Sequence, residues 1–94
     1  MGIKLGIIGC GSFSDEFVGP FKSHPLVEKI ALCDLMPERL KEFSNKYGIH
    51  DCFTDVDEML RTEIDSVAIF VQRHIHGKIV LKCLNAGKKR SLRA

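Results

Sequence analysis

A glycine-rich turn between two apolar segments constrains the fold of this chain more than any other feature. The apolar run 3–8 leads into Gly9-Cys10-Gly11, and an amphipathic segment follows. A second apolar run, 30–33, then ends at Asp34. The order of strand, tight turn, helix, strand and carboxylate is the order that a dinucleotide site requires. The pattern therefore predicts a βαβ unit at the start of the chain.

The residues of the turn have separate roles in this hypothesis. Gly9 would allow the sharp turn, because glycine adopts the required backbone angles at little cost. Gly11 would let the main chain approach a pyrophosphate that a β-carbon would exclude, and a helix beginning near Phe13 would direct free N–H groups at the phosphates. Ser14 replaces the third glycine of the usual pattern, as a small residue that can pack closely against a strand. A purely structural turn is the alternative.

Asp34 is the predicted ribose ligand. Its carboxylate would accept hydrogen bonds from the adenosine ribose hydroxyls and would repel a 2′-phosphate. Leu35 and Met36 follow it, so no arginine directly offsets that repulsion. The sequence therefore predicts NAD rather than NADP as the cofactor. The alternative is that Asp34 is only solvated, or that it caps a helix beginning near Pro37.

Length and composition fit one small domain. The chain has 94 residues, of which 45% are hydrophobic, which suffices for a single core but leaves no room for a separate substrate domain. Its longest apolar stretches are far shorter than a membrane span. No signal pattern opens the chain, so we expect a cytoplasmic protein without a membrane partner.

Cysteine and histidine spacing does not predict a metal site. The four cysteines are far apart and lack a C-x-x-C pair, so we expect reduced, mostly buried thiols. Cys10 and Cys33 end neighbouring predicted strands, and a disulfide between them is a minor alternative. His74 and His76 could bind a metal, but histidines at a strand-to-helix junction more often cap the helix or face solvent.

Charge is divided unevenly along the chain. Residues 1–77 carry twelve acidic and eight basic residues, whereas residues 78–94 carry six basic residues and no acidic one. The surface spread of basic residues that nucleic-acid binders show is absent, so we expect no nucleic-acid partner. We interpret the tail, 89–94, as the basic end of a solvated helix, with a localisation or nucleic-acid signal as the alternative.

The rest of the sequence alternates strand and helix patterns. Strands are expected at 3–8, 27–33, 51–53 and 66–71, and helices at 12–23, 37–47, after Asp55 and at 75–85. Gly19-Pro20 could end or kink the first helix, and Gly48 is expected to end the second. These elements predict a Rossmann-like, doubly wound parallel α/β sheet of about four strands in the order 3-2-1-4. The glycine turn would then lie at the topological switch point.

The glycine turn and several other segments occur along the chain in a recognisable order. They are Gly6 to Ser12, Cys33-Asp34, 37–39, 47–49, the helix after Asp55, 64–67, His76 and 86–88. Over residues 2–88 the arrangement resembles the N-terminal cofactor domain of the glucose–fructose oxidoreductase, inositol dehydrogenase and rhizopine-catabolism (Gfo/Idh/MocA) oxidoreductase family. Members transfer a hydride between NAD(P) and a sugar, polyol or related small molecule. The resemblance implies a partial NAD(P)-binding domain over 1–88, followed by the tail 89–94.

The resemblance also implies a set of cofactor-binding residues. They are Gly9, Cys10, Gly11, Ser12 and Phe13 at the pyrophosphate, Asp34 at the ribose, and Phe70, Val71, Gln72 and His76 on the nicotinamide side. The family usually reads Thr-Pro-Asn-x-x-His after the fourth strand. Here the Pro and Asn are replaced, and only His76 matches.

The sequence departs from the family after Lys88. The family continues with a fifth strand leading into Glu-Lys-Pro, whose lysine is the usual catalytic proton donor or acceptor, whereas this chain ends with 89–94. We therefore assign no catalytic residue and expect an NAD-binding module that does not turn over by itself. One alternative is a non-enzymatic interaction module that forms homo-oligomers through the exposed edge of the strand 66–71. Another is a half-enzyme completed by a separate substrate domain.

Overall fold

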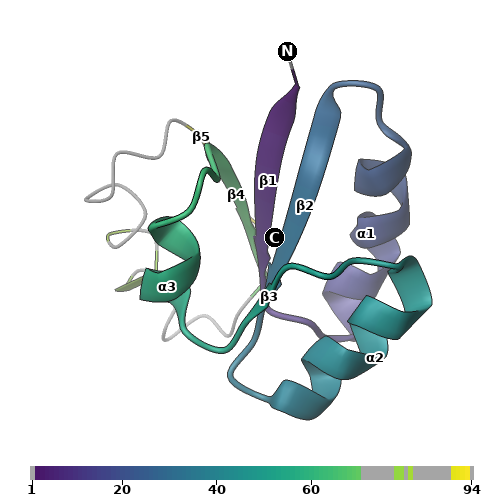
Figure 1. Cartoon of the computed structure of the whole chain (residues 1–94), viewed down its shortest axis with the longest axis vertical. Coiled ribbons are helices and arrows are strands. Elements are labelled where there is room, and N and C mark those ends of the chain that lie inside the picture. Colours follow the sequence, from purple (N-terminus) through teal and green to yellow (C-terminus); the bar gives the residue numbers. More distant parts are fainter. Residues whose placement is uncertain (1, 71–77, 80, 82–89, 94) are drawn as a thin grey trace.

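A parallel five-stranded sheet forms the centre of the computed structural model, which describes residues 2–70, 78–79, 81 and 90–93 (Figure 1). The strands are β1 (Ile3–Ile8), β2 (Val27–Cys33), β3 (Cys52–Phe53), β4 (Ser66–Ile69) and β5 (Arg90–Arg93), in the order β3-β2-β1-β4-β5. The helices are α1 (Ser12–Ser23), α2 (Pro37–Tyr47) and α3 (Val56–Leu60). The predicted strand order 3-2-1-4 is confirmed, and β1 lies where that order reverses.

Both faces of the sheet are covered, as a doubly wound fold requires. In Figure 1, α1 and α2 lie on one side of β1 and β2, and α3 lies on the other. Leu5 and Ile7 pack in the core layer under α1 and α2, while Ile8 packs with α3. Because residues 5–8 of β1 are all buried, that part of the strand is a continuous apolar run rather than an alternating one.

Strand β5 was not predicted. It pairs in parallel with β4, from Ser66 opposite Arg90 to Ile69 opposite Arg93. The prediction that the tail is the end of a helix is therefore wrong, and β4 is not the exposed edge that the homo-oligomer hypothesis required. All four residues of β4 are buried, and buried backbone N–H and C=O groups need hydrogen-bond partners on both sides of the strand. A short strand with charged residues supplies those partners and is typical of the outer position in a sheet.

The helix boundaries agree with the local signals. Pro37 occupies the first turn of α2, and Gly48 ends it with a left-handed φ of 67°. Asp55 caps α3, its carboxylate accepting a hydrogen bond from the Asp57 N–H at 3.1 Å. Helix α1 extends past Pro20 and so does not end early there. Most of the helix predicted over 75–85 lies outside the described residues.

Candidate functional site

A cavity of about 510 Å³ opens at the carboxyl ends of β1 and β2. Its walls come from the turn after β1, the segment after β2, the first turns of α2 and α3, the end of β4 and residues 78–79. The lining residues are Ile8, Gly9, Cys10, Gly11, Cys33, Asp34, Leu35, Met36, Arg39, Asp55, Val56, Phe70, Lys78 and Ile79. Open α/β sheets bind ligands at this position, beside the topological switch point.

Gly9 forms the sharp turn that leaves β1. Its φ is 100°, a conformation that costs little only for glycine. Its N–H donates a hydrogen bond to the Cys33 carbonyl oxygen at 2.7 Å, which ties the turn to the end of β2. The predicted conformational role of Gly9 is confirmed.

Gly11, the N-cap of α1, faces open space. Its φ of −122° is an ordinary extended value, so backbone strain does not require glycine here. A β-carbon at Gly11 would have no other atom within 4 Å. The first N–H groups of a helix also lack intrahelical acceptors. The open space and these donors fit an anionic group such as a pyrophosphate.

Ser14 holds the beginning of α1 in place. Its side chain is fully buried, and its hydroxyl accepts a hydrogen bond from the Gly11 N–H at 2.9 Å and donates one to the Gly11 carbonyl at 3.0 Å. Only a packing role was predicted for Ser14. Its position three residues after the N-cap was a signal for this second role, because side chains there often bond back to the N-cap backbone.

The Asp34 carboxylate joins the two segments that form the cavity floor. One oxygen accepts a hydrogen bond from the Cys10 N–H at 2.7 Å, and the other accepts from the Met36 N–H at 2.8 Å. The second bond forms a local turn before α2, whose N-cap is Met36 and has no side-chain cap hydrogen bond, so Asp34 is not the cap of that helix. A carboxylate has about four lone-pair positions, so both oxygens retain acceptor capacity for a ligand.

Cys10 contributes its backbone rather than its thiol. The side chain is 2% exposed, and burial, reinforced by the negative charge of Asp34, raises the pKa of the thiol to about 12. A protonated, buried thiol is a poor nucleophile. Cys33 is buried as expected, whereas Cys52 is partly exposed.

Among the lining residues that were not predicted as part of the site, three follow Asp34 closely in sequence. Leu35 and Met36 are apolar yet 78% and 47% exposed, and they border the cavity next to Asp34. Arg39 reaches the same cavity from the first turn of α2. The predicted cofactor preference depended only on Leu35 and Met36, the two residues directly after Asp34. The sequence signal for Arg39 was its position in the first turn of the helix that follows Asp34.

The structure describes the remaining predicted residues only in part. Phe70 lines the cavity beyond β4 and stacks on Phe17 of α1, with ring centroids 5.4 Å apart. Val71, Gln72 and His76 lie outside the described residues. Ser12 and Phe13 form the first turn of α1.

In the described part of the chain, no group of three or more His, Cys, Asp or Glu side chains could hold a metal ion. None of the helices in the same residues is long and apolar enough to cross a membrane.

Comparison with known proteins gives a consistent result. The model of an oxidoreductase family with an NAD-binding Rossmann fold matches residues 3–91. The D-apiose dehydrogenase of Paraburkholderia graminis is 33% identical over 85 residues, which are 89% of this chain and 23% of the relative. The trans-1,2-dihydrobenzene-1,2-diol dehydrogenase of Xenopus tropicalis is 30% identical over 93 residues, or 94% of this chain and 28% of the relative.

A solved structure shows the same fold. The scyllo-inositol dehydrogenase of Lactobacillus casei, with bound NAD(H) and scyllo-inositol, superimposes with a TM-score of 0.86 at 26% identity. The match covers 97% of this chain and 28% of the dehydrogenase. The chain thus spans about a quarter of the length of the relatives that it matches.

Proposed function

Because the chain belongs to the Gfo/Idh/MocA oxidoreductase family, we propose that its cavity binds NAD for hydride transfer to or from a sugar, polyol or related small molecule. One observation carries the proposal. A single cavity brings together the open face of Gly11, the N-terminus of α1 and the Asp34 carboxylate. When bound, the nicotinamide ring would supply the hydride acceptor or donor.

The pyrophosphate is proposed to lie against the turn. Gly9 sets the direction of the chain, and Gly11 offers a surface without a β-carbon. The backbone at Ser12 and Phe13 begins α1, where N–H groups and the helix dipole favour negative charge. Cys10 is proposed to act through its backbone, which Asp34 already holds.

The adenosine ribose is proposed to bind at Asp34. Its hydroxyls would donate to the two carboxylate oxygens, which the Cys10 and Met36 N–H groups hold in place. A 2′-phosphate would approach the same negative charge, so we propose that NAD binds more tightly than NADP. Arg39 lines the cavity and offsets part of that repulsion. We therefore expect the preference to shift toward NADP when Asp34 is made neutral.

The nicotinamide side is proposed at the end of β4. Phe70 lies there in the described part of the chain, and Val71, Gln72 and His76 follow it in sequence. Relatives named as dehydrogenases of D-apiose and myo-inositol support a sugar or polyol as the substrate class. Because these relatives are about four times longer, we propose cofactor binding for this chain and hydride transfer for the longer assembly of which such a domain is part.

A titration of the isotope-labelled chain with NAD and then NADP, followed by amide NMR, tests the proposal. We expect shifts at Gly9 to Gly11 and at Asp34, with a lower dissociation constant for NAD. Gly11→Ala and Gly19→Ala form a matched pair, because a β-carbon at either glycine has no other atom within 4 Å. Only Gly11 lines the cavity, so only Gly11→Ala should abolish the NAD shifts. Dispersed spectra that NAD leaves unchanged would contradict the proposed function.

A further inference from the structure

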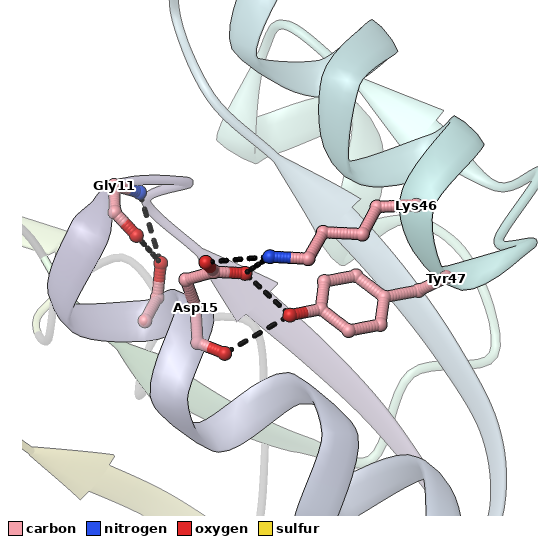
Figure 2. A network of polar contacts seen from close by, with 5 residues as sticks. Gly11, Asp15, Lys46 and Tyr47 are labelled. Carbon is pink, nitrogen blue, oxygen red and sulfur yellow. Dashed lines mark hydrogen bonds and ion pairs between the residues drawn. The ribbon is translucent and has the colours of Figure 1, made fainter.

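A polar network joins the first turn of α1 to the last turn of α2 (Figure 2). Lys46 Nζ lies 3.1 Å and 2.8 Å from the two carboxylate oxygens of Asp15. The Tyr47 hydroxyl donates to the same carboxylate and lies 3.0 Å from the Asp15 carbonyl oxygen. These partners are 31 and 32 residues apart in sequence, so the network depends on the packing of the two helices.

Asp15 connects this network to the glycine turn of the candidate site. Asp15 directly follows Ser14, whose hydroxyl holds Gly11, and its own N–H donates to the Gly11 carbonyl at 3.0 Å. A carboxylate in this turn adds negative charge near the end of α1 where the phosphates are proposed to bind. Hydrogen bonds from Lys46 and from Tyr47 lower the pKa of Asp15, so the carboxylate is ionised at neutral pH.

We propose that Lys46 and Tyr47 are positioning residues for pyrophosphate binding, acting through Asp15. Lys46 compensates the charge of the Asp15 carboxylate, and both residues hold that carboxylate toward α2 (Figure 2). The N-terminus of α1 can then attract the phosphates without a competing free anion. The inference rests on the proposed function, because it assigns these residues to the same dinucleotide site.

A role limited to stability predicts a different pattern. If the network only tied two helices together, its loss would weaken every ligand of the domain alike. A role at the pyrophosphate instead affects NAD, which carries two phosphates, and spares adenosine, which carries none. The two roles also predict different results for a double variant that lacks both the Asp15 carboxylate and Lys46. That variant loses the contact between the helices, but it has no uncompensated negative charge at the N-terminus of α1.

The test is a set of amide-NMR titrations of the full 94-residue chain with NAD and with adenosine at low ionic strength. Lys46→Met should raise the dissociation constant for NAD about three- to tenfold and leave that for adenosine within about twofold. Asp15→Asn combined with Lys46→Met should return the NAD value to within about twofold of the wild type. Salt at about 0.5 M should reduce the effect of Lys46→Met.

Two further variants control for charge and packing. Lys4, near the start of β1, forms another exposed ion pair, with its Nζ 3.0 Å from a carboxylate oxygen of Glu63. Lys4→Met removes this lysine and should leave the dissociation constants for NAD and for adenosine unchanged. Tyr47→Phe keeps the ring, which packs edge-on against Phe43 at 5.8 Å, and removes only the hydroxyl. It should raise the NAD value less than Lys46→Met does, with the same selectivity over adenosine.

The outcomes separate this inference from the proposed function. Equal weakening of NAD and adenosine by Lys46→Met, or a double variant that binds NAD no better than Lys46→Met, overturns the inference alone. A wild-type chain that does not bind NAD overturns the proposed function and the inference together.

Discussion

Replacing Asp34 by alanine should destabilise the chain even when no ligand is bound. The carboxylate accepts hydrogen bonds from the Cys10 and Met36 N–H groups at 2.7 Å and 2.8 Å. Cys10 is 2% exposed, so its N–H would lose its partner without gaining water. Met36 is 47% exposed, so its N–H can bond to solvent instead. The loss therefore comes mainly from one buried donor.

The magnitude follows from the strength of that bond. A hydrogen bond to a charged group contributes a net ~1.5–3 kcal/mol, and Asp34 is only half-buried, so the expected loss is about 2 kcal/mol. For a domain of this size each kcal/mol lowers Tm by ~4–8 °C. Asp34→Ala should therefore lower Tm by roughly 8–16 °C, a large part of the stability of a typical domain.

Thermal unfolding followed by circular dichroism measures this change in the absence of cofactor. The matched control is Asp51→Ala, because Asp51 also loses a carboxylate but only an ion pair with Lys29 at 3.4 Å, in which both side chains are about half exposed. Such a pair contributes at most about 1 kcal/mol. Equal Tm values for Asp34→Ala and Asp51→Ala would refute the reasoning, since the carboxylate would then not hold the turn.

Three further predictions concern the core beneath the site. Gly6→Val should lower the free energy of unfolding by ~1–3 kcal/mol, because even a β-carbon would lie 2.7 Å from the buried Met59 Cε. Urea unfolding should show no such loss for Gly19→Val, because a β-carbon at Gly19 has no other atom within 4 Å and valine is a better helix former than glycine. Ser14→Ala should cost about 1–2 kcal/mol by the same assay, since it leaves the Gly11 N–H without its acceptor,, and an unchanged midpoint would count against the bond. Burial raises the pKa of Cys10 from 9.0 to about 12, so its contribution to stability is complete below pH 9 and is lost as pH rises from 9 toward 12. Between pH 9 and 11 the wild type should lose up to about 1.4 kcal/mol per pH unit more than Cys10→Ala, and parallel pH profiles would contradict this.

The features that sequence analysis predicted correctly depend on neighbouring residues. The apolar run of β1 and the positive φ of Gly9 follow from local side-chain size and backbone freedom. The ends of α2 follow from Pro37 and Gly48, which act within one turn of the helix. The strand order also follows, because short connections and right-handed crossovers leave few ways to arrange parallel strands.

The features that were not predicted from the sequence depend on contacts between distant segments. Arg90–Arg93 carries no apolar pattern of a strand, and only the unpaired edge of a buried β4 explains its pairing. Arg39 lines the cavity because α2 begins beside Asp34 and Arg39 lies in its first turn.

The sequence by itself therefore determined the local elements, the glycine turn and the residue types of a dinucleotide site. Only the tertiary structure decided that Asp34 binds the Cys10 N–H, and that Lys46 and Tyr47 meet Asp15. The physical reason is that local backbone preferences are set by adjacent residues, whereas a hydrogen bond between segments 24 to 32 residues apart forms only where the packing of the sheet and helices brings donor and acceptor together.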